Sequence, residues 1–309
     1  MTLRLPPTFL VIGAYKSGTT SVHHYLAQHP QVFVPRRKEP NYFAFGDVAV
    51  AVGSGAAALP ANGAPHPAAA TSVTRREDYV RLFGDVHGER AVGEVSPEYL
   101  VNERACDAIH RELPDARLVA VLRDPVERAW SDYLMYRRDG LEAEEDFGRA
   151  LDEQDERRRR GAPTAWYVES GFYGRQLARY YDAFPADQIS VHLFEDLVRD
   201  PDGTMAAMTA FLGVDPAPLR SADHHNASGV PRNRALAAVL RSRRWIGPPL
   251  KKVLPDRLRP GLERVVQRGL DRPALAPEHR ARLVETFRDD VALVGRLTGL
   301  DLSSWPTTS

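Results

Sequence analysis

Residues 9–21 read FLVIGAYKSGTTS, and this stretch decides the fold of the chain. Its first four residues form an apolar run typical of a buried strand, and residues 21–28 have the pattern of a helix. The loop between strand and helix directs backbone N–H groups at an oxyanion, and the helix N-terminus adds a partial positive charge. Lys16 adds a full charge, so we predict a phosphate-binding loop. Its candidate ligands are Lys16, Ser17, Gly18, Thr19, Thr20 and Ser21.

The position of the lysine distinguishes this loop from that of nucleoside triphosphatases. Those proteins carry G-x-x-x-x-G-K-[ST], in which the lysine follows the second glycine. Here Lys16 precedes Gly18, and the loop is shorter. The spacing therefore differs from the triphosphate-binding pattern. The alternative is an ordinary glycine turn between strand and helix.

A second strand-to-helix junction carries another candidate anion site. Residues 116–123 form an apolar strand pattern, and residues 123–133 read RDPVERAWSDY. Pro125 suits the first turn of a helix. Arg123 is suited to a bidentate contact with a phosphate, and Ser131 can donate to the same group if the strand end folds over the helix. The alternative is an Asp-capped helix with its arginines in solvent.

Together the two motifs resemble those of sulfotransferases that use 3′-phosphoadenosine-5′-phosphosulfate (PAPS). G-x-x-K-S-G-T-T-S at residues 13–21 is similar to their 5′-phosphosulfate loop, and R-D-P-x-x-R-x-x-S at residues 123–131 to their 3′-phosphate motif. The resemblance is strongest to bacterial relatives of the Golgi-type carbohydrate and heparan sulfate enzymes. It implies a P-loop-type α/β fold, PAPS as sulfuryl donor and 3′-phosphoadenosine-5′-phosphate (PAP) as product. It also implies a hydroxyl-bearing acceptor, namely a small molecule, a glycolipid or a saccharide, and no metal.

Sulfuryl transfer requires positioning, charge stabilisation and a base. Lys16 is expected to stabilise the departing phosphate oxygen. Residues 36–43 read RRKEPNYF, and in the resembling enzymes a glutamate before an aromatic pair serves as base, which implies this role for Glu39. The alternative is an exposed Glu39 carboxylate paired with Lys38 or Arg37.

Residues 93–99, GEVSPEY, resemble the family element E-x-[ST]-P-x-Y, which lines the acceptor cleft. Glu94 is therefore the second candidate for the base. Family members often have lysine where Val95 stands here, which disfavours a heavily sulfated polysaccharide as acceptor. The candidate acceptor-binding residues are Glu94, Ser96 and Tyr42.

Two later segments resemble parts of the nucleotide site. Tyr173 lies where the family has a tyrosine near nucleotide and acceptor, although packing in an aromatic core is the alternative. Residues 224–233 resemble the late loop that closes over the nucleotide, so Ser228, Gly229 and Arg232 are further candidate PAPS ligands, with a ligand-free loop as the alternative. Metal binding through the histidines at 224–225 is disfavoured because adjacent side chains diverge.

Composition narrows the function classes. The chain has 309 residues, and its 41 basic and 41 acidic residues cancel, so no global field selects nucleic acid as partner. Cys106 is the single cysteine, which excludes an internal disulfide and a cysteine zinc cluster. Without a membrane-spanning apolar run or a leader pattern, we expect a cytoplasmic enzyme. The Ala-, Arg- and Pro-rich usage suggests a bacterial gene, while the oligomeric state is unreadable.

Alternating strand and helix patterns predict a mainly parallel sheet with helices on both faces. We expect one sulfotransferase domain over residues 1–309, with a mainly helical part from 232 to 309. The expected strands are Thr8–Gly13, Gln31–Val34, Ala91–Val95, Arg117–Arg123 and Gln188–Phe194. The expected helices are Ser21–Gln28, Glu103–Glu112, Pro125–Arg138, Phe147–Arg160, Gly174–Ala183, Pro201–Leu212 and Glu278–Thr298.

Two segments interrupt the alternation. Residues 47–74 are rich in Ala, Gly and Pro and nearly uncharged, which predicts a flexible insertion, either a plain surface loop or a lid over the acceptor. Residues 232–272 are basic with interspersed apolar side chains. A solvated helical pair is the favoured interpretation of this stretch, and contact of residues 241–268 with a membrane surface or an anionic acceptor is the alternative.

Two other functions compete with sulfuryl transfer. A P-loop kinase would need Mg²⁺ and the G-x-x-x-x-G-K-[ST] loop, which the sequence lacks. A nucleotide-binding module without catalysis would not need both Lys16 and Glu39. The sequence therefore favours a PAPS-dependent sulfotransferase.

Overall fold

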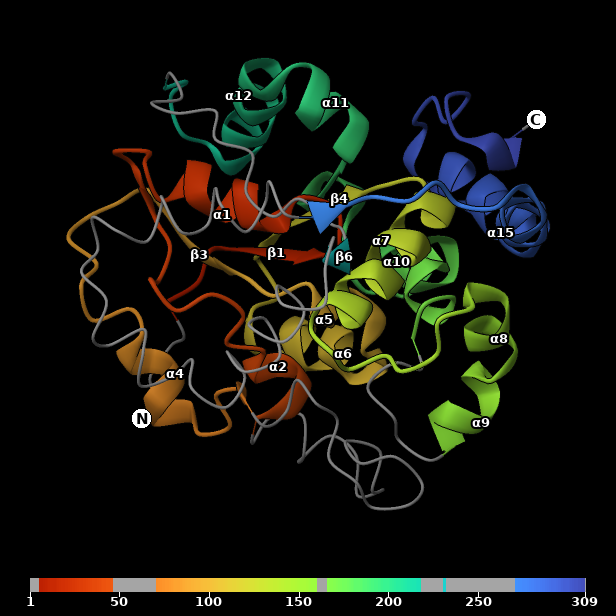
Figure 1. Cartoon of the computed structure of the whole chain (residues 1–309). Coiled ribbons are helices and arrows are strands. Elements are labelled where there is room, and N and C mark those ends of the chain that lie inside the picture. Colours follow the sequence, from red (N-terminus) through yellow and green to blue (C-terminus); the bar gives the residue numbers. More distant parts are fainter. Residues whose placement is uncertain (1–5, 47–70, 160–165, 218–229, 232–269, 309) are drawn as a thin grey trace.

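A parallel β-sheet forms the centre of the structure, a computed structural model that describes residues 6–46, 71–159, 166–217, 230–231 and 270–308 (Figure 1). The strand order is β2-β3-β1-β4-β5, and all four strand pairs are parallel, as predicted. A short antiparallel pair, β6 with β7, lies apart from this sheet. The strands are β1 (Phe9–Gly13), β2 (Val32–Phe33), β3 (Ala91–Val95), β4 (Arg117–Leu122), β5 (Ile189–Leu193), β6 (Val230–Pro231) and β7 (Leu270–Asp271).

Helices cover both faces of the sheet. Figure 1 shows α1 and α12 on one side of β1 and α5 and α6 on the other. The α-helices are α1 (Thr19–Leu26), α2 (Tyr42–Phe45), α4 (Arg76–Arg81), α5 (Glu98–Val101), α6 (Glu103–Glu112), α7 (Pro125–Arg138), α8 (Phe147–Asp152), α9 (Gln154–Arg159), α10 (Tyr173–Ala183), α11 (Phe194–Arg199), α12 (Pro201–Leu212) and α15 (Pro277–Thr298). Short 3₁₀ helices span Glu169–Gly171, Ala186–Gln188 and Pro306–Thr308.

Continuous apolar strands bury side chains on both faces because successive residues point to opposite sides. Leu10 and Ile12 of β1 belong to the core beneath α6, α7, α10 and α15. Phe9 and Val11 belong to the core beneath α1 and α12. The central strand is thus buried from both sides, which fixes the position of the loop that follows it.

The topology brings the two predicted anion motifs to one edge of the sheet. β1 lies between β3 and β4. From β1 the chain continues to β2 and β3 on one side of the sheet, whereas from β4 it continues to β5 on the other side, so the strand order reverses between β1 and β4. In open α/β sheets ligands bind at such a switch point, outside the carboxyl ends of the strands. The loops that follow β1 and β4 both begin there.

The observed elements differ from the expected ones mainly at their ends. The helix expected over Phe147–Arg160 is two short helices, α8 and α9, separated by a turn at Glu153. Phe194, expected to end a strand, begins α11. Sequence analysis missed α2, α4, α5 and α11, which span four to six residues each, too few for a hydrophobic period to emerge.

The two interrupting segments lie mostly outside the described residues. Of the insertion predicted at 47–74, only 71–74 is described, and there Val73 is buried and its N–H donates to the carbonyl oxygen of Pro40 at 2.8 Å. Of the basic stretch at 232–272, only 270–272 is described. The helical part predicted from residue 232 is represented by α15 and the turn after it.

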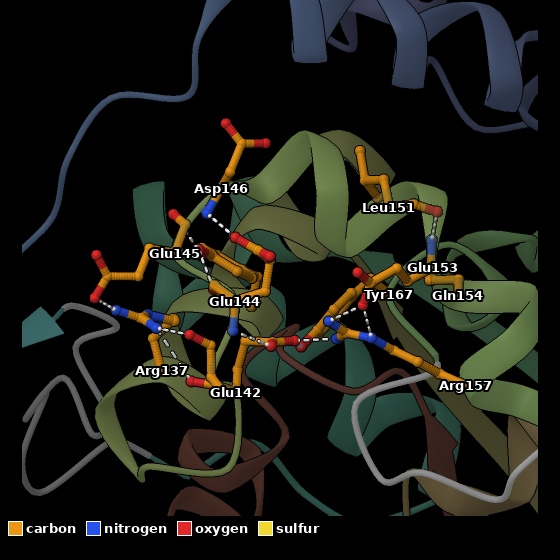
Figure 2. Close-up of polar contacts among 12 residues, drawn as sticks. Arg137, Glu142, Glu144, Glu145, Asp146, Leu151, Glu153, Gln154, Arg157 and Tyr167 are labelled. Carbon is orange, nitrogen blue, oxygen red and sulfur yellow. Dashed lines mark hydrogen bonds and ion pairs between the residues drawn. The ribbon is translucent and has the colours of Figure 1, made fainter.

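The loop that follows α7 is held by a buried ionic cluster (Figure 2). Glu142 is 4% exposed, accepts a hydrogen bond from the Tyr167 hydroxyl at 2.8 Å and pairs with Arg157 of α9. Arg137, in the last turn of α7, donates to the carbonyl oxygens of Glu142 and Ala143. These contacts fix the carboxyl end of α7, which lies beside the phosphate loop.

Candidate active site

The loop between β1 and α1 depends on glycine at both of its ends. At Gly13, an added Cβ would lie 2.5 Å from the Leu100 side chain. At Gly18, which caps α1 with φ of 82°, an added Cβ would lie 2.9 Å from the Phe194 ring. Lys16 also has a positive φ, 64°. The loop is therefore tightly bent and packed, with the N-terminus of α1 at its end.

The Lys16 ammonium lies in a half-buried site at the end of this loop. Its Nζ is 3.4 Å from Sδ of Met135 on α7. The pKa of Lys16 is lowered to about 8, mainly by burial; Asp132 opposes the lowering, and the nearby cations Arg138 and Arg123 contribute to it. Binding of an anion nearby would stabilise the charged form of this lysine and raise its pKa.

Arg123 joins the second motif to the first. It follows the last residue of β4, is 7% exposed and donates from Nη1 to the carbonyl oxygen of Lys16 at 3.2 Å. Its guanidinium lies over the Phe194 ring, 4.9 Å from the ring centroid. Both predicted anion motifs are thus in direct contact through one buried guanidinium.

The start of α7 agrees with the pattern predicted from its sequence. Pro125 occupies the first turn, and the Asp124 carboxylate caps the helix by accepting from the Val126 N–H at 2.8 Å. Ser131 lies two turns further along α7 and is fully buried. On α1, Thr19 is buried and Ser21 half-buried, and the Thr20 hydroxyl accepts a hydrogen bond from Lys38 at 2.7 Å.

A further arginine near this site was not among the predicted ligands. Arg272 follows β7, donates to Glu127 at 2.9 Å and lowers the pKa of Arg123 in addition to the effect of burial. Glu127 also accepts from Arg280 of α15 at 2.5 Å. In the sequence, Arg272 was only the last residue of a basic stretch, and nothing in its spacing connects it with Arg123.

Glu39 lies beside the phosphate loop with its carboxylate accessible. Its side chain is 36% exposed and accepts from Nζ of Lys38 at 2.6 Å, so the pairing weighed as an alternative is present. The backbone at Glu39 has φ of 56°, and its N–H donates to the carbonyl oxygen of Val95 at 3.1 Å. Glu39 is thereby held against the end of β3.

Glu94 has the opposite environment. Its side chain is buried and accepts from the hydroxyls of Tyr99 at 2.5 Å, Ser96 at 2.7 Å and Tyr79 at 3.4 Å. Burial raises the pKa of Glu94 to about 7, and the three hydroxyls oppose the rise. The surrounding hydroxyls limit access of a substrate to this carboxyl.

The remaining predicted residues are buried. Ser96 accepts from the N–H of Asn41 at 3.1 Å, which ties the turn after Glu39 to β3. Tyr42 is fully buried and stacks on Tyr79 with ring centroids 4.5 Å apart, which favours a packing role. Tyr173 is fully buried beside Ser17 of the phosphate loop, and burial raises the pKa of its hydroxyl.

Three predicted ligands, Ser228, Gly229 and Arg232, lie outside the described residues, as do the histidines at 224–225. Within the described ranges, no group of three His, Cys, Asp or Glu side chains is arranged to hold a metal ion. The same ranges contain no helix long and apolar enough to cross a membrane.

The fold defines a class: a doubly wound α/β protein of the P-loop type, in which the two strand-end motifs are in contact. Comparison with known proteins then supplies the family. A sequence model of the sulfotransferase family matches residues 7–218, well over half of the chain. The chain belongs to the sulfotransferase family.

Individual relatives agree with this assignment. The crystal structure of a sulfotransferase from Alicyclobacillus acidocaldarius is similar over 97% of this chain and 98% of that one, with a TM-score of 0.71 and 29% identity. Human heparan sulfate glucosamine 3-O-sulfotransferase 6 is 29% identical over 213 residues, 67% of this chain and 52% of that protein. Membrane-associated sulfotransferase kil1 of Dictyostelium discoideum is 34% identical over 127 residues, 41% of this chain and 22% of that protein. The chain thus spans about half the length of the heparan sulfate relative and less of the other.

Proposed function

We propose that this chain moves a sulfuryl group from PAPS to an acceptor hydroxyl, with Glu39 as base and Lys16 as electrostatic catalyst. PAPS supplies the sulfuryl group, and the bond from sulfur to the phosphate oxygen breaks as the bond to the acceptor oxygen forms. Glu39 takes the acceptor proton, and Lys16 stabilises the charge on the departing phosphate oxygen. The interaction with Lys16 strengthens towards the transition state and so raises turnover.

The contact of Arg123 with the Lys16 carbonyl carries this proposal. It gathers the cations of both motifs in one partly buried place. Burial is the main cause that lowers the pKa of Lys16 and of Arg123; Arg138 and Arg123 add to the first shift and Arg272 to the second, while Asp132 and Glu127 oppose them. Cations that oppose one another's charge are stabilised by a bound polyanion. The site therefore fits a ligand with two separate phosphate groups, such as PAPS.

Exposure supports Glu39 over Glu94 as the base. A base must come within hydrogen-bond reach of the acceptor hydroxyl. The Glu39 carboxylate is accessible, whereas Glu94 is enclosed by three hydroxyls. We therefore assign Glu94 to holding Ser96, and through it the turn that carries Glu39.

Calorimetric titration with PAP tests the nucleotide class. We expect metal-independent binding that weakens about tenfold to a hundredfold in Arg123→Ala, because a charge-assisted contact is lost. Arg199→Ala, which removes an exposed arginine of α11, is the matched control and should bind as the original protein does. Preference for Mg·ATP would support a kinase instead, and absence of any binding would overturn the proposal.

Binding of PAP is also expected to depend on pH through Lys16. The free protein holds the Lys16 pKa at about 8, and a bound anion raises it, so rising pH deprotonates the free form first. Affinity should therefore fall as pH rises from 7 to 9 and be about tenfold weaker at pH 9 than at pH 7. Calorimetry on Lys16→Arg, which stays charged throughout, should show no such decrease. An equal decrease in that variant would exclude Lys16 as its source.

For the acceptor we propose a hydroxyl of a small molecule, a glycolipid or a saccharide. The similarity to a heparan sulfate glucosamine sulfotransferase favours a saccharide. Val95, where such enzymes often have lysine, favours an acceptor with fewer sulfate groups. We further propose that residues 1–309 form one sulfotransferase domain.

A further inference from the structure

Lys38 connects the candidate base with the phosphate loop. Its ammonium donates to Oγ1 of Thr20 at 2.7 Å and to Oε1 of Glu39 at 2.6 Å. Thr20 lies in the first turn of α1, the turn expected to receive the phosphosulfate. The Lys38 side chain is 25% exposed, so the bridge lies at the mouth of the site. One cation is thus shared between the part of the site that binds the donor and the part that receives the acceptor proton.

The arrangement is more constrained than an ordinary surface ion pair. Exposed ion pairs between neighbouring side chains contribute little to stability, because both side chains must give up other conformations to form the pair. Here the backbone of Glu39 is in the left-handed region and bonded to Val95, so the direction of its side chain is set by the end of β3. Thr20 fixes the other end of the bridge. The ammonium therefore has two defined partners.

We propose that Lys38 is a positioning residue that couples donor binding to the freedom of the Glu39 base, an inference that rests on the proposed function. The ammonium donates to Glu39 Oε1, one of the oxygens that would accept the acceptor proton. An anionic donor beside Thr20 competes for the same ammonium. As Lys38 moves towards the donor, Oε1 becomes available to the acceptor, so the base is released only when the donor is present.

Thermodynamic reciprocity gives this coupling a signature that does not require activity. If donor and Glu39 compete for Lys38, removal of the Glu39 charge must strengthen donor binding. Part of any such gain would come from lost direct repulsion between carboxylate and phosphate, which does not involve Lys38. The gain in PAP affinity caused by Glu39→Gln is therefore measured twice, once with Lys38 present and once with its ammonium removed. The difference between the two gains is the part that depends on Lys38.

The test is a double-mutant cycle of PAP affinity, measured by calorimetry on the full chain. Glu39→Gln should bind PAP about twofold to fivefold more tightly than the original protein. In the Lys38→Met background, the same Glu39→Gln change should produce a smaller gain. Equal or larger gains in that background would show direct repulsion alone and would overturn the inference. Absence of PAP binding to the original protein would instead overturn the proposed function.

Turnover provides a second measurement that a purely structural role would not reproduce. Lys38→Met should raise KM for PAPS more than it lowers kcat, because the donor loses a cation while Oε1 of Glu39 is free in either case, and Lys38→Arg should restore part of the loss. Arg37→Met is the matched control, because it removes a cation from the same segment. The Arg37 guanidinium donates to the Thr71 carbonyl oxygen at 2.6 Å. A rise in KM for PAPS in Arg37→Met equal to that in Lys38→Met would reduce the effect to net charge and contradict the inference.

Discussion

Glu39→Gln is expected to lower kcat for sulfuryl transfer by about two to four orders of magnitude, the usual contribution of a general base. The amide retains the size of the side chain but cannot accept the acceptor proton. PAP binding should not weaken, since the loop and Arg123 are unchanged. Measurement of kcat alongside PAP affinity separates loss of the base from loss of the donor site.

Glu94→Gln is the matched control for removal of a carboxylate near the site. It should retain much more turnover, because Glu94 is buried beneath hydroxyl groups and is assigned a supporting role. Thermal denaturation would show whether that variant remains folded. A loss of turnover in Glu94→Gln as large as in Glu39→Gln, at unchanged melting temperature, would transfer the role of base to Glu94.

Arg157→Met is expected to cause a large loss of stability, about 3 kcal/mol in the free energy of unfolding at neutral pH. The Glu142 side chain is only 2% exposed, and removal of Arg157 leaves its charge buried without this cation (Figure 2). Denaturant titrations of the variant and the original protein at neutral pH provide the measurement.

Two companion variants keep this result interpretable. Arg157→Lys preserves a cation and should lose much less stability. The double variant Arg157→Met with Glu142→Gln removes both charges and should recover part of the loss, because the uncompensated buried charge is gone. If the double variant is as unstable as Arg157→Met alone, lost packing of the arginine stem, rather than charge, is responsible.

The fold was predictable because its strands and long helices carry strong local patterns. The short apolar runs at β1 and β4 favoured buried strands, and Pro125 after Asp124 marked the start of α7. The short helices have no such pattern. α2, for instance, is four apolar residues whose conformation depends on the Asn41 turn before it and on packing against α6.

The site was predictable only as separate motifs. Each motif indicated an anion ligand, but the contact of Arg123 with the Lys16 carbonyl depends on β1 and β4 being neighbours, which no local pattern specifies. Arg272 reaches the site through the pairing of β6 with β7. The bridge from Lys38 to Thr20 joins residues 18 apart in sequence, so Lys38 was considered only as a partner of Glu39.

The Phe194 ring limits how this site can change. It lies close to Gly18 on one side and beneath the Arg123 guanidinium on the other, so one aromatic side chain borders both anion motifs. A side chain at residue 18 would clash with the ring, and a smaller residue at 194 would leave both motifs without this contact. Attempts to engineer a different donor specificity would therefore have to vary residues 18, 123 and 194 together rather than one at a time.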